Sequence, residues 1–273
     1  MNLENKVAFV TGGAVGIGRD VALAFAHAGA DVAIAAPEVD ELQSVCGEIE
    51  SIGRKTAWWP LDLNNFDQIE EIRDDVLDKF GRVDTLATVA GIPGSWWLIH
   101  ETPEEDWDQV MNINLKGMFM CCRAFIPTMI AQGSGGSIIT FTSGLGLRVH
   151  PKRGIYAISK WGIIALTKTM AIELAAEQIR VNAVAPGGGV AGERRDRWFE
   201  QAAEQLGGTA EEQRQKMLSA IPTHQLIEPR DIARLCVFLA SDDSRQITGE
   251  VLNINGGHGL AVMDATLPSA VLA

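Results

Sequence analysis

Short apolar segments alternate with longer amphipathic segments along this chain of 273 residues. The short segments are rich in Val, Ile and Ala, as expected of strands that are buried on both faces of a sheet. Seven strands are predicted, at residues 6–11, 31–36, 56–61, 85–90, 137–142, 180–185 and 250–255. The alternation indicates repeated βα units, and therefore an α/β protein whose mostly parallel sheet has helices on both faces.

The amphipathic segments between these strands have the periodicity of helices, and one long insertion interrupts the pattern. The helices are predicted at residues 16–28, 39–52, 66–80, 103–130, 155–176 and 229–240. Such units build a three-layer, doubly wound fold of the Rossmann type, here as a single domain over residues 1–273. Residues 187–226 begin with glycines and continue with charged helix formers, which indicates either a mobile lid over the site or an ordinary pair of surface helices.

The charge and composition of the chain narrow the class of ligand. The formal net charge of -12 opposes binding to nucleic acid or to an anionic membrane surface, and favours a small-molecule partner. Because no apolar run is long enough to span a membrane and the first residues do not resemble a signal peptide, a cytoplasmic protein is expected. The spacing of the cysteines and histidines is not typical of metal ligands, so no metal is predicted.

A glycine-rich loop, TGGAVGIG at residues 11–18, follows the first predicted strand and opens the first predicted helix. Gly12, Gly16 and Gly18 lack the Cβ atoms that would obstruct a tight turn and a bound pyrophosphate, and the helix start offers free N–H groups. A plain turn between strand and helix is the alternative. The position directly after a strand near the N-terminus favours a nucleotide-binding loop.

The stretch GIYAISKWG at residues 154–162 contains the only tyrosine of the chain, Tyr156, and Lys160 follows it four residues later. Residues four apart share one face of a helix, so both side chains can point at one ligand. A phenol has a pKa near 10, and lowering that value to about 7 requires roughly 4 kcal/mol. An ammonium group about 4 Å away contributes roughly this amount at an effective dielectric constant of about 20. The pair therefore predicts a phenol that can act as an acid or base near neutral pH.

A series of motifs occurs in the order typical of one enzyme family. The motifs are TGGAVGIG at 11–18, LDL at 61–63, AG at 90–91, NINLKG at 112–117, TSG at 142–144, YAISK at 156–160, RVNAVAPGG at 180–188 and ITGEVLNINGG at 247–257. In this series the chain resembles the short-chain dehydrogenase/reductase family from about residue 7 to residue 257. The resemblance implies an NAD(P)(H)-dependent oxidoreductase that transfers hydride between nicotinamide and the carbon of a secondary alcohol or ketone.

The resemblance also implies roles for individual residues. Tyr156 is expected to be the general acid/base, and Lys160 to lower its pKa and bind the nicotinamide ribose. Ser143 is expected to hydrogen-bond the reacting oxygen and Asn114 to position a water on the proton path, although either residue alone would be interpreted as structural. Besides the catalytic pair, the expected cofactor contacts are Gly12, Gly16, Ile17, Gly18, Asp62, Leu63, Ala90, Gly91, Pro186, Gly187 and Val190.

Departures from the family's pattern bear on the cofactor. Ala36 stands where the family often carries an acidic residue for the NAD ribose, and residues 35–41 offer three carboxylates and no cation. These carboxylates would repel the 2′-phosphate of NADP, or merely favour the start of the next helix, so NAD is expected in preference to NADP. TVAG at 88–91 replaces the usual NNAG, and Val190 lies near the position of the usual threonine. Asp62 is expected to contact the adenine amine, but could instead cap a helix.

Substrate contacts are expected from Ser143 and Tyr156 and from segments at the carboxyl edge of the sheet. Trp96 and Trp97 could form a wall for a ring or a hydrophobic chain, or could pack under the insertion or at a subunit contact. His150 either borders the pocket or caps a turn. The substrate could be a sugar, a cyclic or aromatic alcohol, or an anionic hydroxy compound.

Two basic stretches, residues 147–153 and 194–197, make an anionic group on the substrate conceivable, although exposed basic side chains are usually solvated. The predicted helices at 103–130 and 155–176 resemble those through which family members associate, so a homotetramer is expected, with a dimer as the alternative. The apolar C-terminal stretch, residues 260–273, would be buried in a subunit contact. A catalytically weak nucleotide sensor or scaffold is a different function class, and the complete set of four catalytic residue types argues against it.

Overall fold

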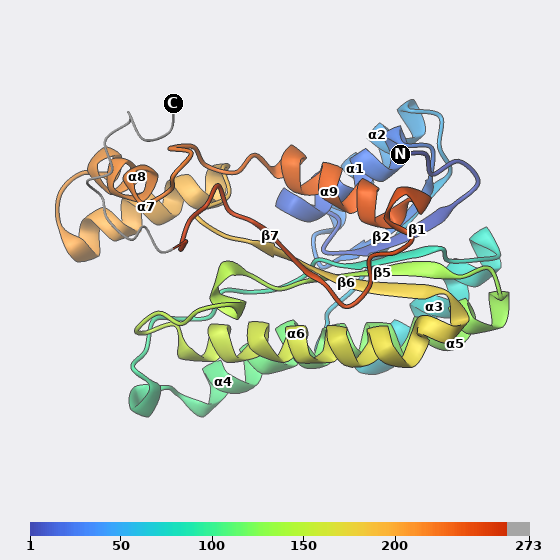
Figure 1. Cartoon of the computed structure of the whole chain (residues 1–273), viewed down its shortest axis with the longest axis horizontal. Coiled ribbons are helices and arrows are strands. Elements are labelled where there is room, and N and C mark those ends of the chain that lie inside the picture. The colour runs from blue at the N-terminus through green and yellow to red at the C-terminus, as the bar shows by residue number, and fades with distance from the viewer. Residues whose placement is uncertain (261–273) are drawn as a thin grey trace.

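Seven strands form one central sheet in the computed structural model, which describes residues 1–260 apart from the side chains at positions 193, 194, 205 and 206 (Figure 1). The strands are β1 (Val7–Thr11), β2 (Asp31–Ala36), β3 (Thr56–Pro60), β4 (Thr85–Thr88), β5 (Gly136–Phe141), β6 (Ile179–Pro186) and β7 (Val251–Ile254). Their order is β3-β2-β1-β4-β5-β6-β7, and each neighbouring pair is parallel. The seven predicted strands are confirmed.

The direction of strand addition changes at β1. The chain builds β2 and β3 on one side of β1 and then crosses back to place β4 on the other side, followed by β5, β6 and β7. The carboxyl ends of β1 and β4 therefore border a crevice of the kind in which open α/β sheets bind ligands. The loops that start at Gly12 and Val89 follow these two ends, and Gly12 lies against Ala90.

Helices cover both faces of the sheet. One layer, drawn above the sheet in Figure 1, contains α1 (Gly16–His27), α2 (Val39–Ser51) and α9 (Pro229–Ala240). The other layer, drawn below it, contains α3 (Phe66–Phe80), α4 (Glu104–Met111), α5 (Met118–Gln132) and α6 (Gly154–Leu174). Each layer closes its own cluster of buried apolar side chains against the sheet. The predicted three-layer α/β fold is confirmed.

The strands are apolar at nearly every position because both of their faces are buried. In β1, Val10 belongs to the apolar cluster under α1, α2 and α9, whereas its neighbour Phe9 belongs to the cluster on the opposite face. The Phe9 ring stacks on the ring of Phe125 in α5, with centroids 4.7 Å apart. Alternate side chains of one strand thus fix both helical layers to the sheet.

A buried carboxylate joins the first strand to the fourth at their amino ends. Asp84, directly before β4, accepts a hydrogen bond from the backbone N–H of Val7 at 2.9 Å. The same carboxylate accepts from Arg82 Nε at 2.8 Å, and Lys6 Nζ lies 3.8 Å from it. Because the carboxylate is hydrogen-bonded and lies next to two cations, its charge can be buried at the amino ends of these two strands.

The helix predicted at 103–130 is interrupted by a π-helical turn, Asn112–Gly117, between α4 and α5. The turn packs on the segment that follows β3, where a Cβ on Gly117 would lie 2.9 Å from Leu63 Cβ. A π-helical turn holds one more residue than an α-helical turn, and such turns are frequent at functional sites. Here the turn carries Asn114, one of the predicted site residues.

The insertion at residues 187–226 contains two helices, α7 (Glu193–Leu206) and α8 (Ala210–Ser219), which pack against each other. Thr209 and Glu212 form a capping box at the start of α8. After α8 the chain returns to the sheet, where Ile227 pairs with Val190. Figure 1 shows both helices at the end of the sheet at which α6 begins.

Within residues 1–260, no helix combines the length and the apolar character needed to cross a membrane. The predicted subunit contact of the C-terminal stretch falls mainly on residues 261–273, outside the described part of the chain.

Candidate active site

The loop after β1 closes tightly on the loop after β4. Gly12 has a φ of +70°, a left-handed conformation, and a Cβ there would lie 2.9 Å from Ala90 Cα. A Cβ on Gly18 would overlap the carbonyl oxygen of Gly12. Both positions therefore require glycine, and the predicted contact residues Gly12 and Ala90 lie side by side.

The start of α1 is open where a phosphate would bind. A Cβ on Gly16 would meet no atom within 4 Å, and the N-cap residue Val15 makes no side-chain capping bond. The first N–H groups of a helix lack partners within the helix and favour an anion. Ile17 packs against the apolar cluster below. The loop therefore leaves room for an anionic group at the start of α1.

Tyr156 and Lys160 lie on the first two turns of α6. Lys160 is buried, with 4% of its surface exposed, and its Nζ donates to the carbonyl oxygen of Phe141 at 2.8 Å. The same Nζ lies 5.7 Å from the ring centroid of Tyr156. The hydroxyl of Thr142 donates to the carbonyl oxygen of Lys160 at 2.7 Å, which ties α6 to the end of β5. The ammonium group is thus anchored beside the phenol, as helical spacing predicts.

Asn114 connects the π-helical turn to the loop after β4 and to α6. Its side chain is fully buried; Oδ1 accepts from the N–H of Ile92 at 2.8 Å, and Nδ2 donates to the carbonyl of Ile92 at 2.9 Å. Nδ2 also lies 3.1 Å from Ser159 Oγ, which donates to the carbonyl of Tyr156 at 2.8 Å. The side-chain amide of Asn114 therefore connects two backbone segments near the phenol, the loop after β4 and the first turns of α6.

Gly91 lies where these side chains meet. A Cβ on Gly91 would lie 3.1 Å from Asn114 Oδ1 and 3.4 Å from Lys160 Nζ. The loop after β4 can approach the two polar side chains this closely only because the residue has no side chain. The structure thus brings Gly91, Asn114, Tyr156 and Lys160 together from three segments of the chain.

Ser143 follows β5 and caps a short 3₁₀ turn, Gly144–Gly146, with its Oγ accepting from the N–H of Leu145 at 3.2 Å. The next residue, Gly144, contacts the loop after β6, since a Cβ there would lie 3.2 Å from Gly187 Cα. This contact brings the end of β5, with Ser143, against the segment that contains the predicted cofactor contacts Pro186, Gly187 and Val190.

The two predicted contacts after β3 differ in exposure. Asp62 is exposed, and its Oδ1 accepts from the backbone N–H and the amide of Asn64, both at 2.9 Å. Leu63 is buried beneath the π-helical turn. These bonds stabilise the turn before α3, but Asp62 does not cap that helix, whose N-cap residue is Asn65. Its exposed position leaves the adenine contact open.

The predicted substrate residues Trp96 and His150 lie together. Their rings meet edge to face with centroids 6.2 Å apart, and Trp96 lies 6.5 Å from Trp198 of α7. Trp97 instead pairs through its backbone with Arg153. The loop after β4, the segment before α6 and the insertion therefore meet at one place, beside Tyr156.

Sequence reasoning did not single out Trp198, and it noted Arg153 only as the last residue of the basic stretch 147–153. Arg153 is the N-cap residue of α6, three residues before Tyr156, and its Cζ lies 5.1 Å from the Tyr156 ring centroid. Helical spacing to Tyr156 was the signal that could have identified it. Trp198 gave no such signal, because its neighbour Trp96 is about a hundred residues away in the chain.

A contact between two further loops closes the same edge of the sheet. Arg148, after the 3₁₀ turn, contacts the ring of His258, after β7. Partial burial, together with the nearby guanidinium of Arg148, lowers the pKa of His258 below its ordinary value.

The cysteines lie away from this site, in the core. All four are unpaired and buried, and burial raises the pKa of the Cys121 thiol to about 12. Such thiols are protonated and poor nucleophiles near neutral pH. Within residues 1–260, no three His, Cys, Asp or Glu side chains are grouped as a metal site would require.

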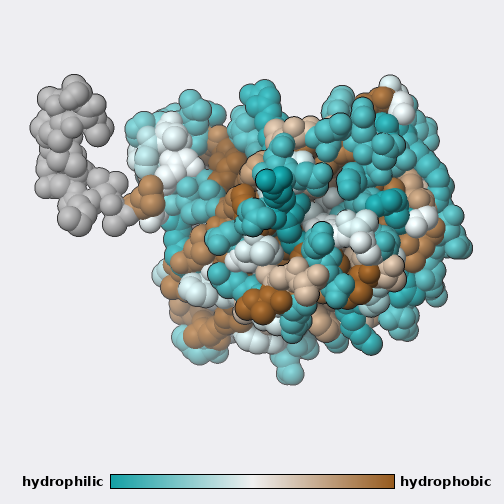
Figure 2. All heavy atoms as spheres, turned by 45° about the vertical axis from the view of Figure 1, so that its right-hand side comes forward, coloured by the Kyte–Doolittle hydropathy of each residue, from teal (hydrophilic) through white to brown (hydrophobic). Residues whose placement is uncertain are grey.

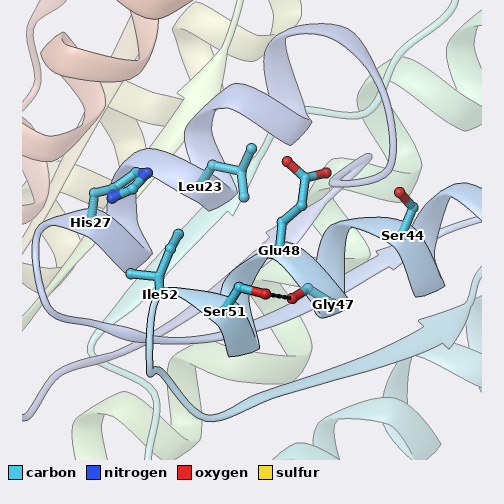
Figure 3. Close-up of a pocket in the computed structure, with 7 residues that line it drawn as sticks. All are labelled: Leu23, His27, Ser44, Gly47, Glu48, Ser51 and Ile52. Carbon is cyan, nitrogen blue, oxygen red and sulfur yellow. Dashed lines mark hydrogen bonds between the residues drawn. The ribbon is translucent and has the colours of Figure 1, made fainter.

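A separate depression of about 410 Å³ lies between α1 and α2 (Figure 3). Its lining comes from the second half of α1, with Leu23 and His27, and from α2, with Glu48 and Ser51. Both helices run back toward the amino ends of the strands, so the depression lies away from the carboxyl edge. Glu48 binds Arg19, and Ser51 Oγ only bonds the carbonyl of Gly47.

A family model described as enoyl-(acyl carrier protein) reductase matches residues 12–259 of the chain. The chain belongs to the short-chain dehydrogenase/reductase family. It is 40% identical to the 3-oxoacyl-[acyl-carrier-protein] reductase FabG of Thermotoga maritima over 258 residues, 94% of this chain and 99% of that protein. It is 33% identical to the uncharacterized oxidoreductase YxbG of Bacillus subtilis over 99% of this chain and 95% of that protein.

Solved structures of short-chain dehydrogenase/reductase proteins show the same fold. An NAD⁺-bound xylitol dehydrogenase superposes with a TM-score of 0.88 at 30% identity, covering 94% of this chain and 100% of the other. A carveol dehydrogenase from Mycobacterium avium, in complex with NAD, superposes with a TM-score of 0.88 at 27% identity, covering 94% and 98%. The chain is accordingly an NAD(P)-dependent oxidoreductase of alcohols and ketones, and nothing in the comparisons supports a sensor or scaffold.

Proposed function

We propose that this short-chain dehydrogenase/reductase interconverts a secondary alcohol and a ketone, with Tyr156 as the acid/base and NAD as the cofactor. The observation that carries the proposal is the buried Lys160 ammonium, held by the Phe141 carbonyl and lying 5.7 Å from the Tyr156 ring. Burial leaves the charge of Lys160 less screened by water, next to the side chain that would exchange the proton.

In this proposal each polar side chain of the site has one task. The Tyr156 hydroxyl exchanges the proton of the substrate hydroxyl, and Lys160 stabilises the phenolate and binds the nicotinamide ribose. Ser143 donates a hydrogen bond to the reacting oxygen, and Asn114 holds the loop after β4 and positions a water on the proton path. When bound, the nicotinamide supplies or accepts the hydride. Positioning and charge stabilisation then provide most of the acceleration.

The cofactor would lie along the crevice between the carboxyl ends of β1 and β4. Its pyrophosphate would meet the loop from Gly12 to Gly18, and its adenine the exposed Asp62. The nicotinamide would lie against Gly91 and the segment from Pro186 to Val190. The open space at Gly16 and the close approach at Gly91 support this placement.

Replacement of the phenol tests the proposed acid/base. Tyr156→Phe is expected to abolish turnover and to leave cofactor affinity nearly unchanged, because only the hydroxyl is lost. A screen of secondary alcohols and sugars, followed by absorbance of NADH, measures turnover, and titration of tryptophan fluorescence measures binding. Turnover that persists in Tyr156→Phe would refute the assignment.

The preference for NAD rests on the end of β2. Ala36 is buried there, and the exposed Asp40 and Glu41 in the first turn of α2 would repel a 2′-phosphate. Two structurally similar proteins are named with NAD bound. Quenching of tryptophan fluorescence is expected to give an affinity for NADH about tenfold or more above that for NADPH. Tighter binding of NADPH contradicts the preference.

The insertion at 187–226 is proposed to be a lid, since Trp198 of α7 reaches Trp96 beside the site. We also propose that residues 1–273 form one domain and that the protein is a cytoplasmic homotetramer. Its substrate is expected to be a small molecule, consistent with the net charge of -12.

A further inference from the structure

A hydrogen bond between Arg148 and His258 links two loops at the carboxyl edge of the sheet, and the proposed proton transfer uses neither residue. Arg148 lies five residues after Ser143, and His258 lies four residues after the end of β7. Because a guanidinium group can only donate, Arg148 Nη2 is the donor and His258 Nδ1 is the acceptor. The imidazole ring in this contact is therefore neutral, with its proton on Nε2.

The turn after β7 fixes the position of His258. Asn255 Oδ1 accepts from the N–H of Gly257 at 2.9 Å, and Asn255 Nδ2 donates to the carbonyl of His258 at 2.7 Å. A Cβ on Gly188 would lie 3.1 Å from His258 Cβ, so the loop after β6 packs directly against this turn. His258 is therefore held next to the segment proposed to bind the nicotinamide.

The loop after β5 packs against the same segment through Gly144. A Cβ on Gly144 would lie 3.2 Å from Gly187 Cα and 3.5 Å from Arg148 Nη2. A Cβ on Gly259 would overlap the Arg148 guanidinium, which therefore lies directly against the chain after β7. Ser143 stands immediately before Gly144 and caps the 3₁₀ turn of this loop. Arg148 thus ties the loop of Ser143 to the loops after β6 and β7.

The groups around the His258 ring favour its neutral form. From the loop after β5 the ring faces the guanidinium of Arg148; from the loop after β6 it faces Gly188, and Arg195 lies against the next residue. The segment after α8 also packs on this turn, and its His224 is exposed and bonds a carbonyl of α8. Burial, together with the nearby guanidinium of Arg148, lowers the pKa of His258 below its ordinary value.

We propose that Arg148 and neutral His258 are positioning residues, whose hydrogen bond holds Ser143 where it can donate to the reacting oxygen. Protonation of His258 removes the acceptor and places two cations side by side, so the bond breaks and the loop after β5 is released. Because the pKa of His258 is lowered, the bond is complete at neutral pH and is lost as the pH falls through that pKa. The inference rests on the proposed function, because it depends on the role of Ser143 in the reaction.

A comparison of kcat in two proteins at two pH values tests the proposal. In His258→Asn the amide oxygen can replace Nδ1 as acceptor, but the side chain does not titrate. The ratio of the wild-type kcat to that of His258→Asn, with a secondary alcohol from the screen, is expected to be near one at about pH 7.5. It should fall about threefold or more at about pH 5, where most imidazole rings are protonated. The titration of Tyr156 is common to both proteins and cancels from this ratio.

Replacement of the donor provides a second test. Arg148→Met should lower kcat about threefold or more at about pH 7.5, whereas Arg148→Lys should retain more of it because lysine is still a donor. His224→Asn is the matched control, since His224 is exposed and its φ of +51° is one that asparagine adopts readily. This control should lose activity on acidification as the wild type does. A kcat ratio that does not change with pH, or a wild-type kcat in Arg148→Met, overturns the proposal.

Hydrogen exchange of backbone amides separates this inference from the proposed function, because it requires no turnover. The N–H groups of Leu145 and Gly146 bond to Ser143, so their protection reports on the loop after β5. Relative to His258→Asn, the wild type should lose protection there at about pH 5 and not at about pH 7.5. Equal protection in the two proteins at both pH values overturns the inference. If protection changes as expected but no alcohol is oxidised, the proposed function is wrong and the positioning contact stands.

Discussion

Gly16 is the residue at which the smallest change should have the clearest effect on the cofactor. Its φ is +55°, and a Cβ there would meet no protein atom within 4 Å. An L-residue in this conformation costs roughly 1–2 kcal/mol. Gly16→Ala is therefore expected to lower the free energy of unfolding by about this amount. It should also weaken NADH binding about tenfold or more, because the methyl group enters the space before the helix N-terminus.

Gly133→Ala is the control for this prediction. Gly133 ends α5 with a φ of +63° and also has no atom within 4 Å of an added Cβ. Urea denaturation should show a similar loss of stability in both variants, whereas fluorescence titration should show weaker NADH binding only in Gly16→Ala. Equal NADH affinity in the two variants would mean that the loop does not face the phosphates.

At the residue scale, sequence reasoning worked where the relevant neighbours are close in the chain. Tyr156 and Lys160 share a helix face because they are four residues apart, and their proximity could be predicted. The partners of Asn114 could not, because its amide bonds Ile92 and Ser159, which only the folded sheet brings near it. Periodicity contains no information about such tertiary contacts.

At the scale of elements, the attachment of β1 to β4 depends on Asp84. Its buried carboxylate accepts from Val7 N–H and from Arg82, and Lys6 is nearby. Hydrogen bonds to charged groups contribute about 1.5–3 kcal/mol each. Asp84→Asn keeps the shape but removes the charge, so it is expected to lower the free energy of unfolding by roughly 1.5–3 kcal/mol, measured by urea denaturation.

Asp74→Asn provides the comparison for an exposed pair. Asp74 lies 2.7 Å from Arg73 Nη2 on the surface of α3, and its side chain is 65% exposed. An exposed ion pair contributes about 0–1 kcal/mol, so this variant should change stability by less than Asp84→Asn. An equal decrease in the free energy of unfolding in the two variants would show that the buried Asp84 carboxylate contributes no more to stability than an exposed one.

The elements themselves were largely predictable, and their irregularities were not. The strands appear within one or two residues of their predicted bounds, because turns and short apolar runs mark them well. The predicted helix at 103–130 contains a π-helical turn, Asn112–Gly117, that its hydrophobic pattern did not indicate. One extra residue in a single turn shifts the hydrophobic pattern too little for the π-helical turn to be detected in the sequence. The close contact of Gly117 with Leu63 is between residues far apart in the chain, so the pattern could not predict it either.

At the scale of the whole molecule, α6 presents an exposed apolar stripe. Ile158, Trp161 and Ile172 are 41%, 49% and 81% exposed and recur at helical spacing on one face. Phe119 of α5 and Trp107 of α4 are also exposed in the same layer. Figure 2 keeps the vertical direction of Figure 1 and shows apolar side chains on the lower half of the molecule, the half that holds this layer. This surface is the expected subunit contact.

Trp161→Glu is expected to convert the proposed homotetramer into smaller species, because a carboxylate without a partner is costly to bury. Size-exclusion chromatography with light scattering measures the change. Val39→Glu is the control, since Val39 is 39% exposed but starts α2 in the opposite layer, and it should leave the assembly intact. A monomeric wild-type protein would contradict the homotetramer, and an intact Trp161→Glu assembly would place the contact elsewhere.

The sequence predicted the layers of the molecule but not the contact between the insertion and the loop after β4. Strands buried on both faces imply helices above and below, so the architecture follows from composition and spacing. The meeting of Trp96 with Trp198 depends on how the insertion folds back, and no local pattern determines that. The stretch at 194–197 was therefore recognised as basic, but the contact of Arg195 with the ring of Trp198 was not predicted.

Tyr156 is the only tyrosine of the chain and lies half-buried on the first turn of α6. Tyrosine labelled with carbon-13 at the ring carbon that bears the hydroxyl would consequently give a single resonance in the magnetic resonance spectrum of the intact protein. The frequency of that carbon differs between phenol and phenolate. A pH titration of the labelled wild-type protein, with and without nucleotide, would then show directly whether the Tyr156 hydroxyl carries its proton.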